Sequence, residues 1–72
     1  MHKEFNSSSL DYMDFNPGTN ILEIGFKRGA IYKYFDVPSS VALELMQEES
    51  AGKFFSKNVA KVFQYEEIKF YG

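Results

Sequence analysis

This chain of 72 residues contains no cysteine and only one histidine. Without cysteine it has no disulfide, no thiolate metal site and no cysteine nucleophile, so packing alone must hold the fold. A chain this short forms one domain, which buries about 60–65% of the surface that its unfolded form exposes. Its core must therefore be rich in apolar side chains, and eight Phe and five Tyr supply them. The lack of cysteine also fits a reducing cytoplasm.

Residues suited to catalysis or metal binding are scarce. The single histidine, His2, lies near the N-terminus, where a mobile segment gives poor support for acid–base chemistry. Asp11 and Asp14 are three residues apart on a predicted strand, so they point to opposite faces and form no carboxylate cluster. The run of serines at 7–9 has no base beside it, and the glycine spacing matches no phosphate-binding loop. We predict a protein that is not an enzyme and that holds no metal or cofactor.

Neither sign of charge dominates the chain, because 10 acidic residues stand against 8 basic ones and the net charge is −2. This balance argues against nonspecific binding of nucleic acid by the whole surface, but it allows a local basic stripe. No apolar run approaches the ~20 residues that cross a bilayer, and the N-terminus lacks the apolar segment of a signal peptide. We expect a soluble, cytoplasmic protein without membrane contact.

Alternation of polar and apolar residues predicts three strands, over residues 10–15, 21–26 and 30–35. Asn-Pro-Gly-Thr at 16–19 predicts a type II turn with Gly18 at the position of positive φ. These strands form an antiparallel meander in the prediction.

The three-residue link at 27–29 predicts a hairpin whose Gly29 forms a G1 bulge. The register that follows sets Leu22 opposite Tyr34 and Ile24 opposite Tyr32, and it pairs Glu23 with Lys33 on the other face. Hydrophobic pattern and charge favour the same register.

After Val37 the apolar period changes from 2 to about 3.6, and Pro38 suits the first position of a helix. We predict helices at 38–49 and 52–63, which gives an α+β fold in which two C-terminal helices cover one face of a three-stranded antiparallel meander. Residues 7–63 form the core of this single domain. The ends, 1–6 and 64–72, are expected to be flexible, with a short strand in the second as the alternative.

Tyr32 and Tyr34 share one sheet face and allow two interpretations. The favoured one places both rings in the core beneath the helices, with their hydroxyls at the rim. The alternative is a stacking platform, because aromatic rings on a sheet beside Lys or Arg bind unpaired bases in several folds. On the opposite face an uncovered patch of Ile21, Ile31 and Phe35 would suit a protein partner or a second copy of the chain.

Basic residues gather in the predicted hairpin and along the second predicted helix, where three lysines repeat every four residues. Such a stripe is usually a solvated helix face, but evenly spaced cations can also follow a phosphate backbone. The predicted RNA contacts are Lys27, Arg28, Lys33, Lys53, Lys57 and Lys61.

The motif residues fall into three segments that together resemble the KTSC domain family. They are Ser8-Ser9-Leu10, Leu22-x-Ile24-x-Phe26-x-x-Gly29-x-x-Tyr32-x-Tyr34-x-x-Val37-Pro38 and Ser50-x-Gly52-x-Phe54-Phe55. The chain departs from the family at Met13-Asp14-Phe15-Asn16, where Val-Gly-Tyr-Asp is frequent, and at Val59-Ala60, where Ile-Arg is typical.

The resemblance implies a small module that ends some lysyl-tRNA synthetases and also occurs alone in bacterial proteins, and for which RNA binding has been proposed. Within this pattern we assign structural roles to Gly29, Tyr32, Tyr34, Pro38, Gly52 and Phe55. We predict a noncatalytic binding module whose ligand is RNA, as a monomer or weak homodimer. The alternative is a protein-interaction or self-association domain that uses the uncovered sheet face.

Overall fold

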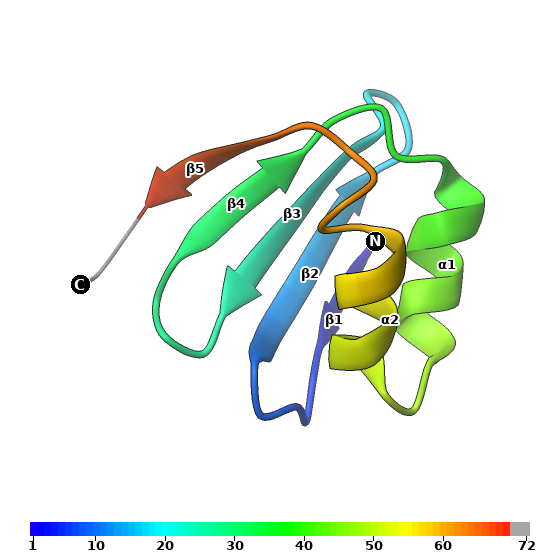
Figure 1. The fold of residues 1–72 in the computed structure, drawn as a ribbon. Helices are drawn as coiled ribbons and strands as arrows, with labels where there is room; N and C mark the ends of the chain where they lie inside the picture. Colours follow the sequence, from blue (N-terminus) through cyan, green and yellow to red (C-terminus); the bar gives the residue numbers. More distant parts are fainter. Residues whose placement is uncertain (70–72) are drawn as a thin grey trace.

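The computed structural model describes residues 1–69 and consists of an antiparallel sheet of five strands and two helices (Figure 1). The strands lie in sequence order across the sheet, and both helices fall between the fourth and fifth strands of the chain. The elements are β1 (His2–Glu4), β2 (Leu10–Asn16), β3 (Ile21–Phe26), β4 (Ile31–Tyr34), α1 (Ser39–Gln47), α2 (Ala51–Asn58) and β5 (Tyr65–Lys69). Within residues 1–69, neither helix is long and apolar enough to cross a membrane.

The predicted α+β fold with two helices on an antiparallel sheet is confirmed, but the predicted number of strands is wrong. The sheet has five strands because a segment near each end of the chain adds an outer strand, β1 beside β2 and β5 beside β4. β1 has only three residues, too few to show an alternating pattern. β5 pairs with β4 although 30 residues, 35–64, lie between the two strands, and no local pattern encodes such a contact.

The predicted hairpin and its register are confirmed. Leu22 lies opposite Tyr34, and Ile24 lies opposite Tyr32. Gly29 has a φ of 99°, which a residue with a Cβ rarely adopts, and its N–H donates to the Phe26 carbonyl at 2.9 Å. The alternation of β3 and β4 therefore places one set of apolar side chains against the helices and the other set on the uncovered face.

The turn after β2 differs from the predicted type II turn. The residue with positive φ is Asn20, at 58°, and Gly18 is not in that region. The side-chain oxygen of Asn16 accepts a hydrogen bond from the Gly18 N–H at 2.8 Å, and its carbonyl accepts one from the Asn20 N–H at 2.8 Å. A local bond from an Asn side chain thus stabilises a turn that is one residue longer than predicted.

Both helices are shorter than predicted. α1 begins at Ser39, because Pro38 keeps an extended backbone and stands just before the helix instead of in its first turn. α2 ends at Asn58, so Lys61 lies beyond the helix and does not continue the row of Lys53 and Lys57. Val62, which a longer helix would have turned toward the core, is 60% exposed.

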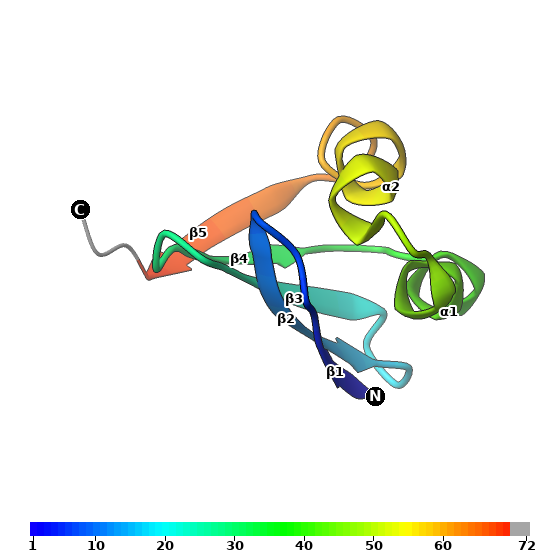
Figure 2. The same ribbon diagram turned by 90° about the horizontal axis from the view of Figure 1, so that it is seen from below.

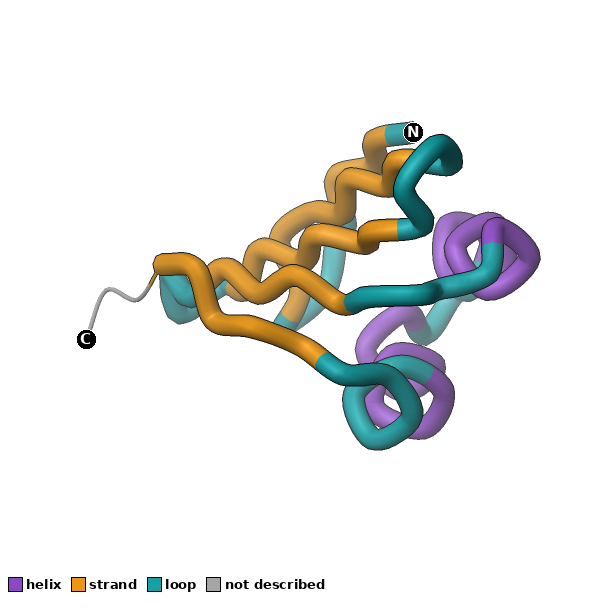
Figure 3. Tube along the Cα trace, turned by 90° about the horizontal axis from the view of Figure 1, so that it is seen from above, coloured by secondary structure: helices purple, strands orange, loops and turns teal. Residues whose placement is uncertain are grey.

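The core lies between the helices and the face of the sheet that they cover (Figures 2 and 3). Phe55 of α2 is buried there, and its ring packs edge-on against Phe26 and Tyr34 with ring centroids 5.5 Å apart in both pairs. In Figure 1, β5 and the adjoining part of β4 extend away from the helices. That part of the covered face is where the candidate site lies.

Candidate ligand-binding surface

Four aromatic rings from three neighbouring strands form a continuous surface, here named the aromatic patch: Phe26 of β3, Tyr32 and Tyr34 of β4, and Tyr65 of β5. Alternation and strand register place all four on the same face. The rings of Tyr32 and Tyr65 stack with centroids 5.2 Å apart and planes 15° apart. Phe26 meets Tyr32 edge-on at 5.3 Å. The rings thus stand in contact across the strands, as a pre-ordered row.

Burial changes along this row. Tyr34 is 2% exposed beneath Phe55, whereas Tyr65 at the edge strand is 55% exposed. Tyr32 and Phe26 are half-buried. The predicted core role therefore describes Tyr34, while Tyr32 and Tyr65 offer ring surface to an outside ligand.

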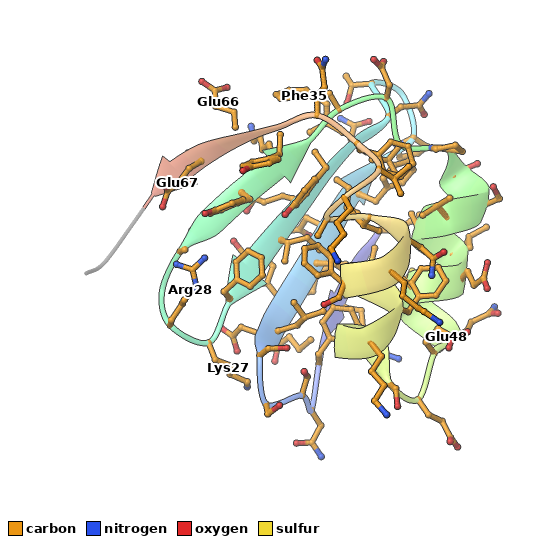
Figure 4. The ribbon with its side chains drawn as sticks, in the orientation of Figure 1. Lys27, Arg28, Phe35, Glu48, Glu66 and Glu67 are labelled. Carbon is orange, nitrogen blue, oxygen red and sulfur yellow. The ribbon has the colours of Figure 1, made fainter. Side chains whose placement is uncertain are left out.

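Arg28 brings a positive charge to the aromatic patch from the turn between β3 and β4 (Figure 4). Its guanidinium carbon lies 5.1 Å from the centroid of Phe26 and 5.7 Å from that of Tyr32. Its Nη2 also donates a long hydrogen bond of 3.5 Å to the Tyr32 hydroxyl. A cation held over ring faces in this way is suited to contact a planar or anionic ligand that reaches the same rings.

The hydroxyl of Tyr34 is kept protonated by its surroundings. Burial raises the pKa of Tyr34 to about 12, and the neighbouring Tyr32 and Tyr65 act in the same direction, whereas Arg28 opposes the shift. The Tyr34 hydroxyl is therefore uncharged near pH 7, Arg28 brings a positive charge to the patch, and Glu67 lies opposite Tyr32 in the strand register.

The predicted basic residues do not form one surface. Lys27 pairs with Asp11 at 3.3 Å. Lys33 projects from the uncovered face, opposite to the aromatic patch, and lies between Glu23 and Glu66 in the strand register. Of the three basic residues of the hairpin segment, Arg28 alone contacts the rings of the patch.

Lys53 and Lys57 line a different feature, an open groove of about 960 Å³ between the β1–β2 loop and α2. We name it the serine groove, because Ser7, Ser8 and Ser9 form one wall. The two walls approach closely at Gly52, where an added Cβ would lie 2.9 Å from the Ser9 Oγ. The structural role assigned to Gly52 thus has a physical reason, and two of the three motif segments meet in this groove.

The uncovered face carries a row of ionisable side chains that crosses all five strands. The register pairs His2 with Asp14, Asp14 with Glu23, Glu23 with Lys33, and Lys33 with Glu66. The ring of His2 lies 2.6 Å from the Asp14 carboxylate, so this residue belongs to a strand and not to a mobile end.

The apolar residues expected on that face are divided by this row. Ile31 and Phe35 lie on either side of Lys33 along the chain, and both are half-buried, as is Ile21. Figure 4 shows Phe35 at the end of the sheet, beside the start of β5.

Sequence reasoning missed Tyr65, the most exposed ring of the patch. A partial signal was present, because Tyr65 lies in the C-terminal segment, for which a short strand was predicted as the alternative to a flexible end. Without its pairing to Tyr34, nothing in the sequence placed this ring beside Tyr32.

The chain is thus a small α+β domain whose five strands lie in sequence order in one antiparallel sheet. The family model of the KTSC domain matches residues 6–65, and the chain belongs to the KTSC domain family. An uncharacterized protein of Stutzerimonas stutzeri is 39% identical over 51 residues, which cover 71% of this chain and 72% of that protein.

The structure is also similar to the crystal structure of a KTSC domain protein from Yersinia pestis, with a TM-score of 0.88 and 27% sequence identity. The match covers 96% of this chain and 97% of that one. A lysine–tRNA ligase of Nostoc sp. is 39% identical over 54 residues, and the matched region spans 75% of this chain but 10% of the ligase.

Proposed function

We propose that this KTSC domain is a noncatalytic module that binds unpaired RNA through the aromatic patch. The observation that carries the proposal is the partly exposed stack of Tyr32 and Tyr65 beside the guanidinium of Arg28. Stacking of a base on an aromatic ring contributes about 1–3 kcal/mol and accepts any base, because every base has a π-face. Bases within a duplex are already stacked on one another, so the proposed ligand is single-stranded.

The modest charge of the domain fits binding in which stacking contributes more than phosphate contacts. The chain has a net charge of −2, and among the side chains that the structure describes Arg28 is the cation that lies over the rings. Each phosphate contact to a single strand adds about 0.7 to the slope of log K against log salt, so a phosphate contact by Arg28 at the patch should contribute about that much.

Relatives support RNA as the ligand. The Nostoc protein that matches this chain is named a lysine–tRNA ligase, and such an enzyme acts on RNA. The matched region is 10% of that protein, so a contribution of the domain to binding its RNA is part of the proposal.

Self-association through the uncovered face is the weaker alternative. A second copy would have to cover the row of charged side chains that includes Glu23 and Lys33, and removing such groups from water is costly unless each finds a partner.

Fluorescence anisotropy with a labelled uridine octamer tests the proposal. We expect Tyr65→Ala to weaken binding by about 5- to 150-fold, which corresponds to the ~1–3 kcal/mol of one stacked base. Tyr65→Phe keeps the ring and should bind as the wild type does. Because Tyr65 is 55% exposed, its removal leaves the core in place.

A second pair of variants separates the two faces of the sheet. Arg28→Gln should weaken binding, whereas Lys33→Gln, which removes the same charge from the uncovered face, should not. The proposal is wrong if the octamer does not bind at roughly 50 mM salt, where contacts with phosphates are only weakly screened. It is also wrong if a duplex of the same length binds equally well.

A further inference from the structure

The serine groove lies directly beside the turn that carries Arg28. The N–H of Lys27 donates a 2.9 Å hydrogen bond to the carbonyl of Ser9, so the turn between β3 and β4 and the β1–β2 loop are joined. Phe26 of the aromatic patch precedes Lys27, and Ser9 lines the groove. A ligand on the patch that continued past this joint would therefore enter the groove.

The groove has a wall rich in hydroxyl groups. Ser7 is committed to its own loop, since its Oγ accepts hydrogen bonds from the N–H groups of Ser9 and Leu10 at 3.1 and 3.2 Å. Ser8 and Ser9 are exposed, and Ser56 of α2 is exposed on the opposite wall. Exposed hydroxyls can donate hydrogen bonds to phosphate oxygens and accept them from ribose hydroxyls.

Charged side chains of both signs line the groove. Lys53 and Lys57 are four residues apart on α2 and so lie on the same side of that helix, where both line the groove. The carboxylates of Glu48 and Glu49 line it at the connection between the helices, and the carboxylate of Glu4 lines it at the end of β1. Lys3 also lines it, but its ammonium is bound to the Met46 carbonyl at 2.6 Å. An anionic chain in the groove would thus follow the α2 wall and stay away from the connection.

We infer that the serine groove is a second subsite, which holds the sugar–phosphate backbone of the strand whose bases stack on the aromatic patch. Lys53 and Lys57 contact phosphates there, and the exposed serine hydroxyls contact phosphate or ribose oxygens. This inference rests on the proposed function, and it adds the route of the strand: from Tyr65 and Tyr32, past Arg28, and between the loop and α2.

The first experiment maps amide shifts with two probes, a uridine octamer and an abasic ribose–phosphate octamer without bases. We expect uridine to shift amides at both Tyr65 and Lys57, and the abasic strand to shift those at Lys57 alone. Shifts at Tyr65 without any at Lys53 or Lys57 would overturn the subsite and leave the proposed function standing. With the uridine octamer, shifts confined to the groove would overturn stacking, and no shift with either probe would overturn both the subsite and the proposed function.

The second experiment measures the slope of log affinity against log salt for charge variants. Lys53→Gln with Lys57→Gln should lower the slope by about 1.4, so that binding between 50 and 200 mM salt falls about sevenfold less than in the wild type. Lys61→Gln is the matched control, because this lysine is equally exposed but does not line the groove.

Removing carboxylates from the groove should change the affinity in the opposite direction to removing its lysines. Glu48→Gln with Glu49→Gln should tighten binding by removing repulsion, while Glu44→Gln, on the exposed part of α1 outside the groove, should not. Equal effects of groove and control variants would show that general charge, and not this groove, sets the affinity, and would overturn the inference.

Discussion

The contact between Gly25 and Tyr12 on the uncovered face gives a quantitative test of the sheet. A Cβ added at Gly25 would lie 2.0 Å from the Tyr12 Cε1 and 2.5 Å from its Cδ1. Carbon atoms in contact need about 3.5–4.0 Å, so the ring would have to move by roughly 1.5 Å or more. A side chain at position 25 is therefore excluded by the tyrosine ring, which occupies the space that it would fill, and not by the backbone conformation.

Moving the ring also disturbs a hydrogen bond. The Tyr12 hydroxyl donates to the Glu23 carboxylate at 2.6 Å, and burial together with this carboxylate raises the pKa of Tyr12. Because the ring is partly exposed, water can replace that bond, and overpacking contributes most of the loss. We expect Gly25→Ala to lower the free energy of unfolding by about 1–3 kcal/mol.

The reasoning is tested by a double-mutant cycle with Tyr12→Ala, followed by urea unfolding. Once the ring is gone, Gly25→Ala should be neutral or should stabilise the strand by about 0.5–1 kcal/mol, because glycine weakens a strand interior. With a slope near 1 kcal/mol per molar urea for so small a protein, the loss in the wild-type background shifts the midpoint by about 1–3 M. An equal loss with and without Tyr12 would refute the steric explanation.

Two further predictions concern the pH dependence and a turn. The free energy of unfolding should fall as the pH rises from about 10 to about 12, because the raised pKa values of Tyr34 and Tyr12 let the folded state keep protons that the unfolded state loses. Tyr34→Phe removes the contribution of Tyr34 and should make this fall shallower in unfolding curves measured across that range, whereas an unchanged slope would contradict the assignment. Asn20→Ala should lower the melting temperature, because alanine is disfavoured by about 1 kcal/mol at a φ of 58°. Asn20→Gly should have a melting temperature equal to or above that of the wild type, because glycine adopts this φ readily. Equal melting temperatures for the two variants would be inconsistent with strain at this position.

The sequence predicted correctly those parts of the fold that depend on neighbouring residues. The alternation in β3 and β4, together with Gly29, was sufficient to give the hairpin and its register, because a short loop leaves few ways to pair the two strands. The helix bounds were less accurate. α2 ends at Asn58 although the apolar pattern continues to Phe63, because the chain must turn there to return to the edge of β4 as β5.

In the candidate site, too, the sequence predicted the features that depend on neighbouring residues, and packing decided the others. Residues of the patch on β3 and β4 were placed on one face by their period, but their exposure depends on how far α2 reaches, which only packing decides. The sequence placed Lys33 opposite Glu23 on the other face, as the structure does, but only the fold shows that Arg28 lies over the rings of the patch.

By itself, the sequence determined the class of fold, the central hairpin, the two helices and the family pattern, since these follow from period, turn chemistry and motif spacing. The tertiary structure alone decided three things: that β1 and β5 complete the sheet, that Tyr65 joins Tyr32 in an exposed stack, and that the β1–β2 loop meets α2 at Gly52. Each of these is a contact between segments distant in the chain. Such contacts form when the whole core packs, and no local pattern of residues specifies them.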